Sequence, residues 1–191
     1  IVIDRLKSPK QDLSSLFVLR KEGDSPIDSK LLSEDLMEFV NRELKENNRT
    51  FFAFNKISHW EIIALVEDSE NKSKNIETQR RLAAKVLDFC DNEYIKHLQL
   101  VSNISKDETM GFVEGMLLAS YTFDSYKTDP KKCTHPFDKL SIVNPFVDSK
   151  DIDQALIIAR AVEKCKDLVN EPFCSLNAEG LAAAFVNMSH E

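Results

Sequence analysis

The sequence lacks the features that mark several common functional classes. It has only four glycines in 191 residues, and no apolar run approaches the roughly 20 residues that a transmembrane helix needs. No G-x-S-x-G, H-E-x-x-H or P-loop pattern occurs, so the usual motifs of serine hydrolases, zinc proteases and nucleotide triphosphatases are missing. Positive charge is also scarce, because 25 lysines and arginines stand against 32 aspartates and glutamates, a net charge of −7. A general nucleic-acid or anionic-membrane surface is therefore not expected.

The cysteines are few and scattered. Cys90, Cys133, Cys165 and Cys174 form no C-x-x-C pair and are not accompanied by paired histidines, so the sequence predicts no zinc site. No secretory leader is recognisable in the chain. Scattered cysteines without such a leader indicate reduced thiols, and we expect a cytoplasmic protein.

The histidines do not indicate a catalytic centre. His59 stands beside Trp60 at the start of a β-branched run, and we interpret it as an edge residue of a sheet. His97 opens an alternating run and is expected to face solvent. Cys133 and His135 place a thiol near an imidazole, but their i, i+2 spacing in a proline-bracketed loop does not position a nucleophile against a base. We therefore predict no catalytic, cofactor-binding or metal-binding residue in this chain.

What the sequence does contain is an alternation of strand-like and helix-like segments. Runs typical of strands occur at 1–6, 16–20, 51–54, 62–66, 97–102 and 140–143. Helical periodicity occurs at 33–46, 76–92, 107–127 and 151–169, and polar loops are expected at 21–26 and 67–75. Because parallel strands need helical crossovers, this order predicts an α/β fold with a mixed, mostly parallel sheet flanked by helices. The runs at 51–54 and 62–66 fit either a hairpin or two adjacent strands.

The segment 107–127 is expected to be the central packing helix. Gly111, Gly115 and Ala119 recur at i, i+4 and i+8, which places them in one bare strip along a helix. Each glycine costs a helix about 0.5–1 kcal/mol relative to alanine, so two on one strip indicate a neighbouring backbone at very close range. Acidic residues at its start and Lys127 at its end suit the two ends of the helix dipole.

Two motifs carry a family resemblance. The segment E-G-M-L-L-A-S-Y-T-F-D-S-Y-K, from Glu114 to Lys127, resembles the last helix of the N-terminal domain of leucyl (cytosol) aminopeptidases. The residues that carry this resemblance are Glu114, Gly115, Leu117 or Leu118, Tyr121, Phe123, Asp124, Tyr126 and Lys127. Further on, K-D-L-V-N-E-P, from Lys166 to Pro172, resembles the R-D-L-V-N-x-P junction at which the linker helix of that family enters the catalytic domain. Lys166 stands where the family has arginine, which argues against a bidentate contact at this position.

The resemblance implies a domain organisation. Residues 1–148 would form the N-terminal, macro-like domain, 149–171 the linker helix, and 172–191 the truncated start of the catalytic domain. The chain begins without methionine and stops inside a helical pattern, so we expect a fragment. The parent implied by the resemblance is a cytoplasmic hexamer that removes N-terminal residues from peptides. It would use two divalent ions, zinc or manganese, bound by the catalytic domain.

The catalytic signatures of the family are missing from the chain. Neither a G-K-G-x-x-F-D-x-G-G run nor an N-T-D-A-E-G-R-L run is present. The stretch from Asn177 to Leu181 is similar to the second run but lacks its aspartate and arginine, and we interpret it as the start of a helix capped by Ser175 or Asn177. The tail from Phe173 to Glu191 would lack the domain on which it packs, and it is expected to be disordered or artificially docked.

Two alternatives to a scaffold role remain open. Macro domains bind ADP-ribose, but phosphate cradles rely on glycine-rich loops, and none of the four glycines makes one. Some relatives have a DNA-contacting accessory domain, and the net charge of −7 argues against that role.

Overall fold

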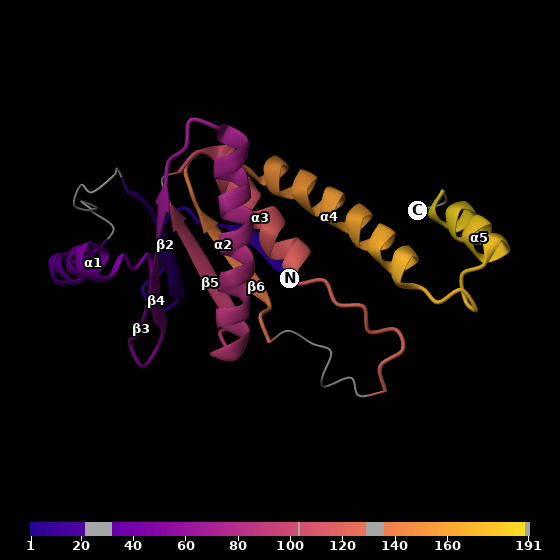
Figure 1. The fold of residues 1–191 in the computed structure, drawn as a ribbon, viewed down its shortest axis with the longest axis horizontal. Coiled ribbons are helices and arrows are strands. Elements are labelled where there is room, and N and C mark those ends of the chain that lie inside the picture. The colour runs from indigo at the N-terminus through magenta and orange to yellow at the C-terminus, as the bar shows by residue number, and fades with distance from the viewer. Residues whose placement is uncertain (22–31, 103, 129–135, 190–191) are drawn as a thin grey trace.

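A six-stranded sheet organises the chain, whose computed structural model describes residues 1–21, 32–102, 104–128 and 136–189 (Figure 1). The strands are β1 (Val2–Arg5), β2 (Ser14–Lys21), β3 (Phe51–Asn55), β4 (Trp60–Glu67), β5 (His97–Ser102) and β6 (Lys139–Val143). The helices are α1 (Glu34–Asn47), α2 (Lys72–Asn92), α3 (Lys106–Ala119), α4 (Ser149–Asn170) and α5 (Ala178–Met188). The turn predicted at 21–26 lies, except for Lys21, outside the described residues.

The sheet confirms the predicted α/β class. Its strand order is β1-β6-β5-β2-β4-β3, and every neighbouring pair is parallel except β3 with β4. The antiparallel pair is a hairpin, in which Phe52 lies opposite Ile63, so the hairpin alternative for these two runs is the correct one. Helices α2 and α3 provide the crossovers from β4 to β5 and from β5 to β6, as parallel pairing requires.

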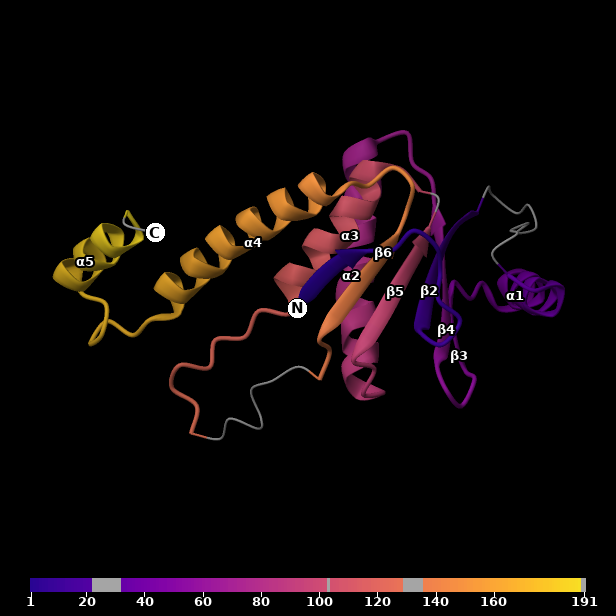
Figure 2. The same ribbon diagram turned by 180° about the vertical axis from the view of Figure 1, so that it is seen from behind.

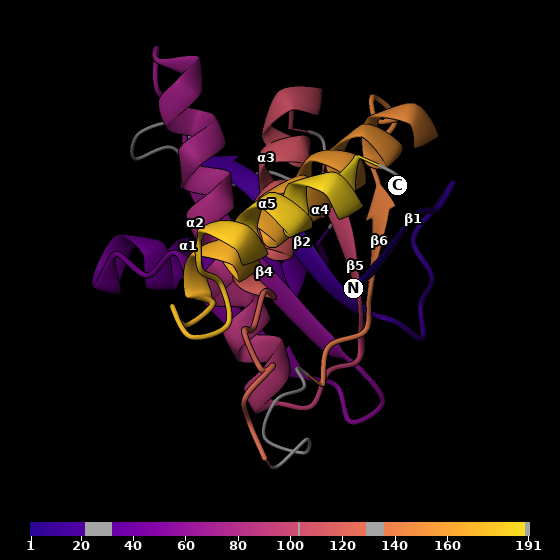
Figure 3. The same ribbon diagram turned by 90° about the vertical axis from the view of Figure 1, so that its right-hand side faces the viewer.

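The two faces of the sheet are covered differently. The larger core cluster lies between the sheet and helices α2, α3 and α4, with Leu16, Leu98 and Leu140 fully buried in it. On the opposite face α1 packs only over the β2-β4-β3 half, around Val40 and Phe52. Figure 2 shows α1 alone on its side of the sheet, and Figure 3 looks onto the side on which α4 and α5 lie.

Helices α2 and α3 pack at very short range, as the glycine strip predicts. A Cβ built on Gly115 would lie 2.5 Å from the carbonyl oxygen of Arg80 and 2.6 Å from its Cα. A Cβ on Gly111 would lie 2.8 Å from Cγ2 of Ile76. The two glycines therefore let the backbone of α2 lie directly against α3, which accounts for residues that weaken a helix on their own.

The central helix is shorter than predicted. It ends at Ala119, and the predicted extension to Lys127 is wrong. Ser120 closes α3, because its amide donates to the Met116 carbonyl and its hydroxyl donates to the Leu117 carbonyl at 2.9 Å. The residues from 121 to 128 then continue as a non-helical strap, so the dipole role assigned to Lys127 does not apply.

The second helix is longer than predicted, since α2 starts at Lys72 and the loop expected at 67–75 is confined to 68–71. The Asn71 side chain caps it by accepting from the amides of Ser73 and Lys74. The first turn of α2 lacks an apolar stripe, which explains why periodicity alone placed it in a loop.

The C-terminal part of the chain extends away from the sheet. Helix α4 has 22 residues, a length of about 33 Å at 1.5 Å per residue, and α5 lies at its far end (Figure 1). Asn177 caps α5 by accepting from the amide of Gly180, which confirms one of the two predicted caps. The tail, which the sequence predicted to be disordered or artificially docked, contains helix α5, and no residue of this helix is buried.

Candidate functional site

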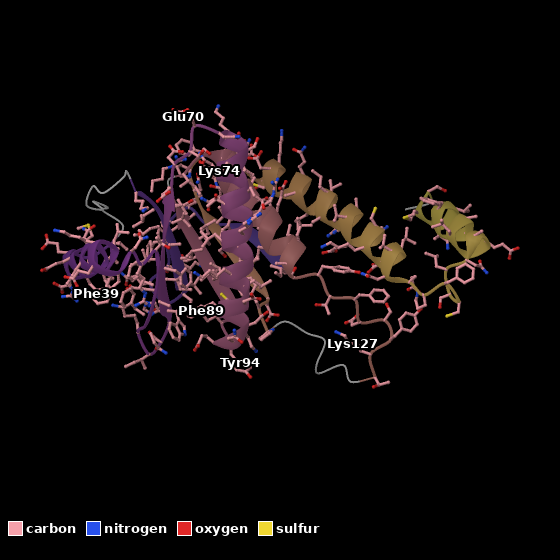
Figure 4. All side chains as sticks on the ribbon, viewed as in Figure 1. Phe39, Glu70, Lys74, Phe89, Tyr94 and Lys127 are labelled. Atoms are coloured by element: carbon pink, nitrogen blue, oxygen red, sulfur yellow. The ribbon has the colours of Figure 1, made fainter. Side chains whose placement is uncertain are left out.

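The first candidate site lies at the carboxyl ends of β2 and β4, the edge at which open α/β sheets bind ligands. A pocket of about 300 Å³ lies there between the first turns of α2 and α3. Figure 4 shows Glu70 at this end of α2. The pocket is lined by Arg20, Asp68, Ser69, Glu70, Lys72, Asn75, Ile76, Ser105, Asp107 and Glu108.

The one arginine of this pocket is already paired with carboxylates of the chain. Its guanidinium contacts both Asp68 and Glu108. Hydrogen bonding from Arg20 holds the pKa of Asp68 below its ordinary value. Because Glu108 is only 6% exposed, the interaction with Arg20 compensates a charge that would otherwise be buried alone.

The helix N-termini of this pocket are capped by the chain itself. The Ser105 hydroxyl accepts from the amide of Glu108, and the Glu108 carboxylate accepts from the Ser105 amide at 3.3 Å and hydroxyl at 2.5 Å. At the start of α2, the Asn71 side chain accepts from the amides of Ser73 and Lys74. A phosphate would need these amides and the arginine, so the geometry supports a tie between β2, β4 and α3 better than an anion site.

The second candidate site is a joint between the two motifs that carry the family resemblance. The Tyr121 hydroxyl donates to Oδ1 of Asp167 at 2.7 Å and accepts from Nδ2 of Asn170 at 3.2 Å. The Tyr126 hydroxyl donates to Oε2 of Glu171 at 2.5 Å. The joint therefore connects the strap at 121–128 with the end of α4, and Figure 4 shows Lys127 on the strap beneath that end.

Lys166 takes part in this joint as a single donor. Its Nζ donates to the carbonyl of Leu118 at 3.1 Å and lies 4.8 Å from the centre of the Tyr121 ring. The contact is one hydrogen bond with a cation–π interaction, in agreement with the expectation that lysine makes no bidentate contact here. Beside it, a pocket of about 330 Å³ is lined by residues 120–125, Glu163 and Asp167.

The predicted position of His97 needs correction. Its ring is half-buried, not turned to solvent, and Nε2 lies 2.8 Å from the hydroxyl of Ser141, which donates to Asp4 at 2.5 Å. Burial lowers the pKa of His97, and the positive charge of Lys139 lowers it further. Ser141 is fully buried and lies between the other two groups, so the trio is a structural network and not a nucleophile with its base.

The remaining singled-out residues do not converge. His59 precedes β4 in the hairpin at the edge of the sheet, with its ring 4.0 Å from the Glu61 carboxylate. Cys133 and His135 lie outside the described residues. Burial raises the pKa of the Cys90 thiol to about 12, whereas Cys165 and Cys174 are exposed free thiols.

Comparisons of the sequence and the fold with known proteins show which proteins the chain resembles. No family model matches it. A probable cytosol aminopeptidase from Aquifex aeolicus is 28% identical over 119 residues, which cover 60% of this chain and 24% of that protein. The chain resembles the cytosol aminopeptidases. A mutant tomato leucine aminopeptidase superposes with a TM-score of 0.73 at 12% identity, covering 96% of this chain and 41% of the other.

The likeness to the leucine aminopeptidase N-terminal domain confirms the predicted fold. A second solved structure, the bottromycin maturation enzyme BotP, superposes with a TM-score of 0.64 at 15% identity over 93% of this chain and 37% of that enzyme. The chain spans about a quarter of the length of the Aquifex aeolicus aminopeptidase that it matches. Among the described residues no helix is long and apolar enough to cross a bilayer.

The donor set does not fit the metal centre that the aminopeptidase resemblance implies. A two-metal hydrolase needs several carboxylates converging on ions about 3.5–4 Å apart. Within residues 1–21, 32–102, 104–128 and 136–189, no three His, Cys, Asp or Glu side chains form a group suited to a metal ion. Asn177 and Glu179, from the stretch that resembles a catalytic run, lie at the start of α5.

Proposed function

We propose that this chain is the non-catalytic N-terminal domain of a leucyl aminopeptidase-like metallo-exopeptidase. The observation that supports this most strongly is the superposition of 96% of the chain on 41% of a leucine aminopeptidase. The metal-binding runs of the family are missing from the sequence, and we assign two divalent ions, zinc or manganese, to a catalytic domain beyond this chain.

In this proposal residues 1–148 form the N-terminal domain, 149–171 the linker helix and 172–191 the start of the catalytic domain. Helices α4 and α5 leave large apolar side chains uncovered, as expected of a surface that another domain or subunit covers. These exposed residues, with those between the helices, are Ile157, Ile158, Val169, Phe173, Leu181, Phe185 and Val186. We propose that the domain supports hexamer assembly or access to the active sites of a cytoplasmic enzyme.

The first experiment tests the absence of catalysis. The 191-residue chain is assayed for release of leucine from a leucyl amide with manganese or zinc added. We expect no turnover above the rate with metal alone. Clear turnover that titrates with protein concentration would contradict a non-catalytic role.

The second experiment tests assembly. The complete product of the gene is compared with a version that lacks residues 1–171, and the mass of each is measured by sedimentation. The proposal expects a hexamer for the complete protein and a smaller or less stable assembly for the shortened one. An unchanged hexamer with unchanged peptidase kinetics would remove both suggested roles.

Two binding measurements separate the alternatives. Calorimetry with ADP-ribose is expected to show no saturable binding, because Arg20 and the N-termini of α2 and α3 are already occupied by side chains of the chain. Saturable micromolar binding would instead favour a macro-like ligand-binding module. Salt-dependent retardation of DNA would favour a DNA-contacting role.

A further inference from the structure

We propose that Tyr121 and Tyr126 form a clasp that fixes the direction in which α4 leaves the domain. The clasp comprises the strap at 121–128 and its partners at the end of α4. The contacts of the clasp lie within this chain and do not depend on the function proposed above. The use of the clasp, which is to orient the catalytic domain, rests on the function proposed above.

The burial of α4 shows why a clasp is needed. Ile152, Ala155 and Ala159 are buried against the domain, and they recur at the three- and four-residue steps of one helix face. Beyond Ala159 no residue of α4 is buried. Fully buried packing is therefore confined to the first half of the helix, and the second half has the polar contacts of the clasp.

The first tie of the clasp lies along one face of α4. Asn170 lies three residues after Asp167 and four after Lys166, so its side chain is a neighbour of both on the helix surface. All three converge on Tyr121: the carboxylate accepts from its hydroxyl, the amide donates to its oxygen, and the ammonium lies over its ring. Lys166 also donates to the carbonyl of Leu118, which connects α4 directly to the last turn of α3.

The second tie lies one helical turn further on. Glu171 follows Asp167 by four residues and accepts from the Tyr126 hydroxyl at 2.5 Å. The Ser175 hydroxyl lies 3.0 Å from the same phenol oxygen, which extends the tie past Pro172. The strap is shaped for this contact by a turn in which the Lys127 amide donates to the Asp124 carbonyl at 2.9 Å.

The two ties act through hydroxyl groups, which allows them to be removed cleanly. A tyrosine changed to phenylalanine keeps its ring and loses only the donor and acceptor. The ring of Tyr126 lies 5.9 Å from that of Phe123, and that contact would remain. The chain contains only three tyrosines, and the third, Tyr94, is 79% exposed at the end of α2 (Figure 4).

The experiment measures amide hydrogen exchange by mass spectrometry on the full 191-residue chain. The double variant Tyr121→Phe/Tyr126→Phe is compared with the natural chain and with the control Tyr94→Phe. We expect exchange at 163–171 and 121–128 to become roughly tenfold faster in the double variant. The reason is that each lost charge-assisted hydrogen bond stabilised the state in which the strap is bound to the end of α4. Exchange in α2 should stay unchanged, and the control should match the natural chain.

Two outcomes would overturn the clasp. One is unchanged exchange at 163–171 in the double variant. The other is equal acceleration in α2, which would mean general destabilisation. Neither outcome depends on aminopeptidase activity, so failure of the clasp and failure of the proposed function can be distinguished.

Discussion

The close contact between α2 and α3 leads to a quantitative prediction for Gly115→Ala. The new methyl group would lie 2.5 Å from the Arg80 carbonyl oxygen and 2.6 Å from its Cα, whereas ordinary contacts begin near 3.4 Å. The obstructing atoms are backbone, so the methyl group can be accommodated only if α2 and α3 move apart by most of an ångström. Such a separation loosens the core cluster that both helices cover.

The size of the effect follows from two opposing contributions. Alanine favours the helix over glycine by about 0.5–1 kcal/mol. Overpacking of a well-packed core costs about 1–3 kcal/mol and more where backbone must shift. We therefore expect Gly115→Ala to lower the free energy of unfolding by roughly 2 kcal/mol, a fall in melting temperature of about 4–8 °C for a chain of this size.

Urea unfolding followed by circular dichroism measures this change, and two matched glycines serve as controls. Gly111→Ala should cost less than Gly115→Ala, because its nearest obstacle at 2.8 Å is the side-chain carbon Cγ2 of Ile76. Gly180→Ala should be nearly neutral, since its nearest atom is 3.1 Å away in a helix without buried residues. If Gly115→Ala proves as stable as Gly180→Ala, the inferred contact between the two helices is wrong.

Three further predictions concern other parts of the fold. Ile57→Asn should raise the free energy of unfolding by about 0.5–1 kcal/mol in urea, because Ile57 is fully exposed with a φ of 71° that asparagine tolerates better. Glu108→Gln should lower it by roughly 2 kcal/mol in thermal denaturation, as Arg20 loses a charged partner and α3 part of its cap. The pKa of His97 is below 6.5, so stability should be complete above about pH 6.5 and fall as pH drops through the folded pKa. His97→Gln should remove that dependence, and nuclear magnetic resonance titration of the ring measures the pKa directly.

Most of the layered fold could be predicted because it depends on local periodicity. The strands at 97–102 and 140–143 and the helix starting near 151 lie within two residues of their predicted bounds. The errors occur where an element has an atypical end. The first turn of α2 is polar, and the apolar residues after Ala119 continue the helical period of α3 by coincidence while serving the strap.

The candidate sites could not be predicted, because their partners are far apart in sequence. Arg20 and Glu108 are 88 residues apart, and Tyr121 and Asp167 are 46 apart. The sequence did single out both motifs that form the clasp, yet it predicted that the helix at 107–127 continues through Tyr121. Only the end of α3 at Ala119 turns that side chain toward α4, and no periodic pattern encodes such a meeting.

The two candidate sites support a division of roles within the chain. At the carboxyl edge of the sheet, Glu108 and Asp68 occupy the positions at which a ligand anion would meet Arg20 and the start of α3. These contacts stabilise the domain, and they pair the Arg20 guanidinium with two carboxylates of the chain. In the C-terminal part of the chain, α4 and α5 have large exposed apolar side chains. The tyrosine clasp binds the end of α4 beside them. The paired arginine at the carboxyl edge of the sheet and the clasp at the end of α4 both support the role proposed above, in which the domain positions a neighbouring domain.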